Sequence, residues 1–149
     1  MTEPAFLLLH GSVVQWQGGA VLLRGPSGAG KSDLALRLID RGAQLVADDQ
    51  VEIRRDGDFL LAGPPAPLAG LLEVRGLGIM RIGHRAPARL TLAIDLIEEE
   101  LVERLPEPAR TSLLDVTLPL LRLSPWPASA ASKVRLGLQW ADGRIAADS

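Results

Sequence analysis

The stretch RGPSGAGKSDLA, residues 24–35, decides the fold of this chain. It contains Gly25, four further residues and then Gly30-Lys31-Ser32, which is the spacing of a phosphate-binding loop. The apolar run AVLLRG (20–25) precedes it, and KSDLALRLIDRG (31–42) follows with apolar residues at helical spacing. The stretch therefore predicts a buried strand, a glycine-rich loop and an amphipathic helix, in that order.

The residue types of this loop suit a bound phosphate. The predicted contact residues are Gly25, Pro26, Ser27, Gly28, Ala29, Gly30, Lys31 and Ser32. Small residues allow successive backbone N–H groups to point at phosphate oxygens, and the helix N-terminus adds positive potential. We expect Lys31 to reach the β- and γ-phosphates and the Ser32 hydroxyl to bind Mg²⁺. The alternative is a glycine-rich turn that binds no ligand.

Two carboxylates end the next apolar segment, QLVADD (44–49), which predicts a second buried strand. Phosphate loops commonly use an acid from the end of a neighbouring strand to hold Mg²⁺. Because side chains alternate along a strand, only one of Asp48 and Asp49 is expected to face the phosphates, unless the strand ends there and the chain bends. The alternative is an Asp pair that caps the following turn.

Composition limits the class of protein. With 149 residues and 47% apolar residues, the chain is expected to form one domain over residues 1–149. The net charge of -2 and the pI of about 5.7 argue against nucleic acid or an anionic membrane as a partner. The chain has no Cys, and no Lys or Arg precedes Arg24, so the cationic start of a secretory signal is missing. We expect a cytoplasmic protein.

The rest of the chain predicts further strands and a second helix. Expected strands are AFLLLHGSVVQW (5–16), a hairpin of VEIRR (51–55) and FLLAG (59–63) around Asp56-Gly57, ARLTLAIDLI (88–97), and SLLDVTLPLLRL (112–123) as one strand broken near Pro119. EEELVERL (98–105) is expected to form one exposed helical segment. A last helix is expected over 128–140, with Val134, Leu138 and Trp140 buried. The fold class is α/β, with a mixed sheet and flanking helices.

From His10 to Met80 the chain resembles a known family. HGSVVQWQGGAVLLRGPSGAGKSDLALRLIDRGAQLVADDQVEI followed by LLEVRGLGIM is similar to the catalytic domain of HPr kinase/phosphorylase. The resemblance implies a protein-serine kinase that uses ATP and Mg²⁺ and acts on the phosphocarrier protein HPr. It also implies the reverse reaction, in which inorganic phosphate attacks phosphoserine and pyrophosphate is released.

The resemblance assigns roles to single residues. It gives Lys31 to the phosphates, Ser32 to the metal, and makes Asp48 the acid/base with His10 beside it. Asp49 and Glu73 become metal-side carboxylates, and Arg75 the cation of the signature. Without the resemblance, His10 reads as a packed or surface residue, and Glu73 with Arg75 reads as a surface ion pair. On an extended segment Glu73 and Arg75 are expected to share a face.

Three departures from the family pattern affect these expectations. His10 lies near the start, so the chain resembles a catalytic core without the additional N-terminal domain. RIGHRAPARLTL (81–92) is shorter than the mobile loop of the family, and its Arg81, Arg85 and Arg89 have no transferred role. The C-terminal part is shorter too, so the substrate docking and the hexameric assembly of the family are not transferred to this chain. Two other functions stay open: a nucleotide-binding regulatory module without transfer activity, and a P-loop kinase for a different substrate.

Overall fold

The computed structural model describes residues 6–148, which contain eleven strands and two α-helices. The first half holds β1 (Phe6–His10), β2 (Ser12–Trp16), β3 (Gly19–Arg24), α1 (Lys31–Asp40), β4 (Gln44–Ala47), β5 (Gln50–Asp56) and β6 (Phe59–Gly63). The second half holds β7 (Leu71–Val74), β8 (Gly78–Arg81), β9 (Ala88–Leu96), β10 (Ala109–Leu113), β11 (Val116–Leu123) and α2 (Ala130–Ala141). Short 3₁₀ helices lie at Ala66–Leu68 and Glu99–Leu101.

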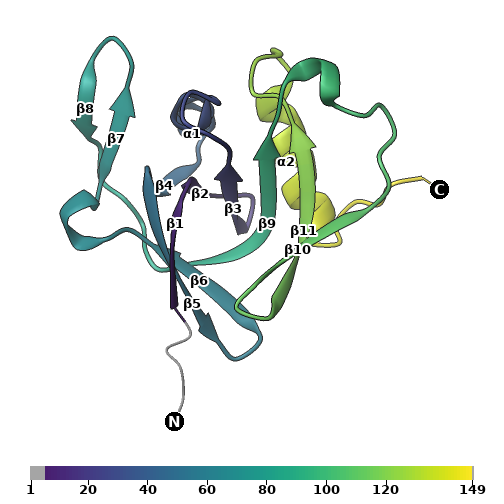
Figure 1. The fold of residues 1–149 in the computed structure, drawn as a ribbon, viewed down its shortest axis with the longest axis horizontal. Helices are drawn as coiled ribbons and strands as arrows, with labels where there is room; N and C mark the ends of the chain where they lie inside the picture. Colours follow the sequence, from purple (N-terminus) through teal and green to yellow (C-terminus); the bar gives the residue numbers. More distant parts are fainter. Residues whose placement is uncertain (1–5, 149) are drawn as a thin grey trace.

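Nine of the described strands form one mixed sheet; seven follow the order β1-β5-β6-β9-β3-β2-β4, and β11 and β10 branch from β9. The long strand β9 runs parallel to β3 and to β11, and β10 pairs antiparallel with β11. The remaining strands, β7 and β8, form a separate hairpin that projects from the molecule beside α1 (Figure 1). The α/β fold with a mixed sheet and flanking helices is therefore confirmed.

Strand β3 is buried on both of its faces, which explains its continuous apolar sequence. Val21 and Leu23 pack with α1 and α2 in one hydrophobic cluster. Ala20 and Leu22 belong to a second cluster, to which β5 and β6 contribute Ile53 and Leu60. Because β3 crosses the centre of the sheet between these clusters, the loop that follows it starts from a fixed point.

Several elements agree with the sequence, and some do not. The strand, loop and helix around residues 24–35, the hairpin after Asp56 and the helix near the C-terminus are confirmed. The segment 5–16 is split at Gly11 into β1 and β2, which pair with different strands. Trp140 is only partly buried, whereas Val134 and Leu138 are buried as expected. The expected helical segment over 98–105 is limited to the 3₁₀ turn Glu99–Leu101.

The prediction of a single strand over 112–123 is wrong, because a tight turn divides this region into β10 and β11. Leu114 and Asp115 form the turn with φ of 49° and 62°, a conformation that sequence rules expect of glycine or asparagine. Pro119 lies inside β11 rather than at a break. The pairing of β11 with β9 begins only at Leu120, so the missing N–H of Pro119 removes no bond to β9.

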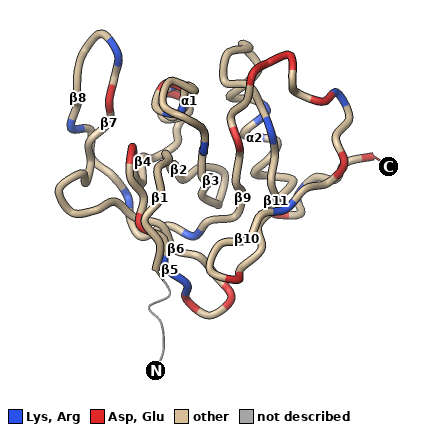
Figure 2. Tube along the Cα trace, in the orientation of Figure 1, with Lys and Arg blue, Asp and Glu red and all other residues tan. Residues whose placement is uncertain are grey.

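Charged residues of both signs are spread along the whole tube in Figure 2. In the described part of the chain, neither helix combines the length and the apolar character that a bilayer crossing needs.

Candidate active site

The glycine-rich loop leaves β3 at Arg24 and enters α1 at Lys31, as the sequence predicts. Gly28 and Gly30 have φ of 84° and 94°, which L side chains rarely adopt. Gly30 is also closely packed, because a Cβ there would lie 2.8 Å from Cγ of Pro125 and 3.0 Å from Cη2 of Trp126. Both glycines are therefore required by the backbone path that turns the loop into the helix.

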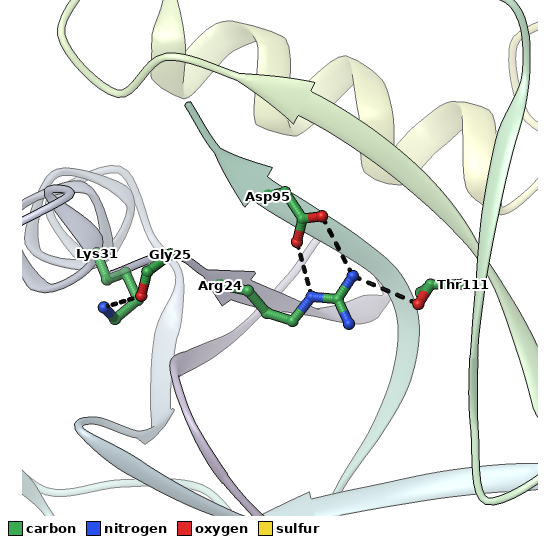
Figure 3. A network of polar contacts seen from close by, with 5 residues as sticks. All are labelled: Arg24, Gly25, Lys31, Asp95 and Thr111. Atoms are coloured by element: carbon green, nitrogen blue, oxygen red, sulfur yellow. Dashed lines mark hydrogen bonds and ion pairs between the residues drawn. The ribbon is translucent and has the colours of Figure 1, made fainter. Parts of the chain in front are cut away.

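Arg24 fixes the point where the loop begins (Figure 3). Its Nε donates to Oδ1 of Asp95 at 2.7 Å, and its Nη2 donates to Oδ2 of Asp95 at 3.3 Å and to Oγ1 of Thr111 at 3.4 Å. Arg24 and Asp95 are register partners on the parallel strands β3 and β9. This two-point ion pair joins the end of the central strand to its neighbour immediately before Gly25.

Lys31 and Ser32 occupy the first turn of α1. The Lys31 ammonium donates to the carbonyl oxygen of Gly25 at 2.6 Å (Figure 3) and to that of Pro26 at 3.0 Å, so it lies over the loop. The Ser32 hydroxyl donates to Asp48 at 2.8 Å from Oδ1 and 3.1 Å from Oδ2. The ammonium group of Lys31 thus lies over the loop, and Ser32 connects the first turn of α1 to Asp48, which follows β4.

Asp48 and Asp49 differ sharply in their surroundings. Asp48 is 4% exposed, and its carboxylate accepts hydrogen bonds from the Ser12 hydroxyl at 2.6 Å, the Ser32 hydroxyl and the Glu73 backbone N–H at 3.2 Å. Asp49 is exposed and has φ of 70°. Strand β4 ends at Ala47, so the chain bends at the Asp pair and strict alternation does not continue through it.

A cleft of about 650 Å³ opens in front of the loop. Its walls include the loop residues Gly25, Pro26, Ser27, Gly28 and Gly30, then Lys31, Ser32, His10, Asp49, Glu73 and Arg75, together with Asp33, Leu36, Val74 and Trp126. Of the residues that the sequence assigns to the site, Ala29 and Asp48 are the two that do not line it. Asp48 lies behind the wall and touches the cleft residues Ser32 and Glu73.

Two distant parts of the chain, β1 and the β7–β8 hairpin, bring further polar groups into this cleft. His10 ends the edge strand β1, Glu73 lies in β7, and Arg75 lies in the turn between β7 and β8. Glu73 and Arg75 both line the cleft although Arg75 lies outside the strand. Arg81, Arg85 and Arg89 do not line it; Arg89, for example, lies 3.7 Å above the ring of Phe59.

The sequence interpretation missed several residues of the site, among them Ser12 and Trp126. Ser12 is fully buried and donates to Asp48, and its signal is a serine placed two residues after His10 within an apolar run. Trp126 lines the cleft from the far end of the chain. Its signal is an aromatic residue held between Pro125 and Pro127 in a segment without regular structure.

The fold and the cleft together define an α/β domain with a mixed sheet and a glycine-rich loop between β3 and α1. The sequence matches the family model described as HPr Serine kinase C-terminal domain over residues 5–124. The chain therefore belongs to the HPr serine kinase C-terminal domain family.

The chain is similar to curated relatives and to solved structures, of which the following are examples. It is 42% identical over 127 residues to an HPr kinase/phosphorylase of Geobacillus thermodenitrificans, covering 77% of this chain and 41% of that protein. It is 52% identical over 75 residues to an HPr kinase/phosphorylase of Exiguobacterium, covering 50% of this chain and 24% of that protein. The chain thus spans less than half the length of these relatives. The Hpr(Ser) kinase/phosphatase structure from Coxiella burnetii has the same fold, with a TM-score of 0.82 at 22% identity over 93% of this chain and 97% of that one.

Proposed function

We propose that the chain transfers the γ-phosphoryl group of ATP to a serine of an HPr-type phosphocarrier protein, and that it reverses this modification with inorganic phosphate. The observation that carries the proposal is the cleft itself. It brings the phosphate loop, Lys31 and Ser32 together with His10, Asp49, Glu73 and Arg75. The curated relatives carry the name HPr kinase/phosphorylase, which supports this choice of chemistry and of substrate.

The donor groups of the cleft suit Mg²⁺ held together with a nucleotide. Mg²⁺ is usually bound through one or two carboxylates, with phosphate oxygens and water completing its shell. The described residues contain no group of three or more His, Asp or Glu that could hold a metal without such help. Ser32 and Glu73 line the cleft and are the residues that would hold the cation. When bound, it would neutralise charge on the phosphates.

The surroundings of the two carboxylates favour a division of roles opposite to the one that the family resemblance suggested. A proton acceptor must contact the hydroxyl of the substrate. Asp48 is buried and already accepts hydrogen bonds from three donors, whereas Asp49 is exposed and lines the cleft. We therefore assign the proton transfer to Asp49, and to Asp48 the task of holding Ser32 in place.

The reaction then balances in both directions. In the kinase direction the serine oxygen attacks the γ-phosphorus, the bond to the β–γ bridging oxygen breaks, ADP leaves, and the serine proton passes to Asp49. In the reverse direction an oxygen of inorganic phosphate attacks the phosphoserine phosphorus, and the bond to the serine oxygen breaks. Asp49 returns a proton to that oxygen and pyrophosphate leaves. His10 and Arg75 supply donors for the phosphoryl oxygens.

Incubation with HPr, ATP and Mg²⁺, followed by excess inorganic phosphate, tests the proposal. Intact mass should show one phosphoryl group gained by HPr and then lost, with pyrophosphate formed in the second step. ATP binding without any change in HPr would contradict the proposed function and would favour a nucleotide-binding module or another substrate.

A further inference from the structure

Trp126 is placed where it can contact a ligand of the cleft. It lies between β11 and α2, lines the cleft, and is 59% exposed. The chain has three Trp, two Phe and no Tyr, all within the described residues, and Trp126 is the one of these aromatic side chains that lines the cleft. A large exposed aromatic surface at the wall of a polar cleft is a feature that folding alone does not require.

The segment that carries Trp126 is held rigidly against α1. The guanidinium of Arg37 donates to the carbonyl oxygen of Pro125 and, through Nε, to Oδ2 of Asp33 at 3.1 Å. The backbone N–H of Trp126 donates to the buried hydroxyl of Ser124 at 3.3 Å. With Pro125 and Pro127 on either side, the backbone of this segment has little freedom. The backbone that carries the indole is therefore preorganised.

The loop has two different sides. Ser32, at the start of α1, donates to Asp48, which also accepts from the backbone N–H of Glu73. The α-carbon of Gly30 faces Pro125 and Trp126, because a Cβ there would lie 3.0 Å from Cη2 and 3.2 Å from Cζ2 of the indole. One side of the loop, the carboxylate side, thus holds Asp48 and Glu73, and the other holds the indole of Trp126 beside the Arg37–Asp33 ion pair.

A nucleotide whose phosphates lie on the loop must direct its base to one of these sides. On the carboxylate side the base would fill the space that the attacking serine needs. We propose that the base lies on the other side and stacks on the indole of Trp126, which serves as its platform. This inference rests on the proposed function, since it requires the phosphates to occupy the loop. The platform offers ring surface rather than donors that read base edges, so purines should bind more tightly than pyrimidines.

Comparing ATP with pyrophosphate separates stacking from support of the loop. Binding of each ligand with Mg²⁺ is measured by calorimetry for the wild type, Trp126→Ala and Trp126→Phe. Trp126→Ala should weaken ATP binding about tenfold and leave pyrophosphate binding unchanged, whereas Trp126→Phe should keep most of the ATP affinity. Phe59→Ala serves as a control, since it removes an exposed aromatic ring that lies outside the cleft.

The outcomes are distinguishable. An equal loss of affinity for ATP and pyrophosphate in Trp126→Ala would show that the indole supports the loop at Gly30 and would overturn the platform. Unchanged ATP affinity in Trp126→Ala, with or without a higher KM for HPr, would also overturn the stacking of the base on Trp126. Phosphate binding by the loop would not be affected by this result. If the wild type binds neither ATP nor pyrophosphate, the proposed function fails and the platform fails with it.

Discussion

The hydroxyl of Ser12 donates to Oδ1 of Asp48 at 2.6 Å, and both side chains are buried. This bond joins the first residue of β2 to the residue that follows β4. The same carboxylate accepts from Ser32 of α1 and from the backbone of Glu73 in β7. Asp48 therefore connects four elements behind the cleft, and its place in the site depends on donors that are far apart in the sequence.

Ser12→Ala should lower the free energy of unfolding by about 1–3 kcal/mol, because a buried carboxylate loses one of its donors. Chemical denaturation measures the change. Ser112→Ala is the matched control: its hydroxyl lies 3.2 Å from that of Thr117 on the surface, so its loss should cost less than about 0.5 kcal/mol. Equal effects of the two substitutions would argue against a structural role of the Ser12–Asp48 bond.

Asp49→Asn should abolish phosphoryl transfer in both directions while leaving the stability and ATP binding nearly unchanged. The side chain is exposed, and Asn tolerates a positive φ about as well as Asp does. Single-turnover transfer to HPr and ATP calorimetry measure the two effects.

Asp48→Asn provides the comparison. It replaces an acceptor of three bonds with a group that also carries N–H donors, so it should destabilise the fold by about 1–3 kcal/mol. Full transfer activity in Asp49→Asn, together with a normally stable but inactive Asp48→Asn, would restore the roles that the resemblance suggested.

The sequence predicted the local parts of the site well. The loop spacing, the strand before it and the helix after it follow from residues that are neighbours in the chain, and the structure confirms them. Which of Asp48 and Asp49 is buried could be determined only from the three-dimensional structure. β4 ends at Ala47 and Asp49 adopts a positive φ, so neither residue type nor spacing reveals which carboxylate is buried.

Long-range contacts explain the remaining differences. Trp126 reaches the loop only because β11 runs beside β9 and returns the chain to α1. The turn at Leu114-Asp115 carries no glycine or proline to mark it, and its positive φ values are set by the pairing of β10 with β11. Such features depend on tertiary packing, which a local pattern does not contain.

Arg24→Lys should weaken binding of pyrophosphate and ATP to a similar extent. Lys keeps the positive charge but cannot form the two parallel bonds to Asp95. The end of β3, from which the loop starts at Gly25, is then held less firmly. The stability should fall by less than about 1 kcal/mol, because both side chains are partly exposed. Arg122→Lys, an exposed position opposite Asp95 on β11, should change neither affinity.

Lys31→Ala should weaken nucleotide binding and transfer together, since the ammonium group is the cation that lies over the loop. Lys31→Arg should recover little of the loss, because a planar guanidinium does not replace a compact point charge at this position. Affinity for Mg²⁺-pyrophosphate and the rate of transfer are the two measurements. Lys133→Ala, in an exposed position on α2, tests whether loss of any lysine has the same effect.

Gly30→Ala and Gly28→Ala separate backbone strain from crowding. Both glycines have a positive φ, so each alanine should cost about 1–2 kcal/mol of stability. A Cβ at Gly28 meets nothing within 4 Å, whereas one at Gly30 lies 2.8 Å from Pro125 and 3.0 Å from the indole. Gly30→Ala should therefore cost about 1–3 kcal/mol more than Gly28→Ala and should displace Trp126. Denaturation measures the difference, and Trp fluorescence reports the displacement. Equal costs would show that Pro125 and Trp126 do not press on the loop.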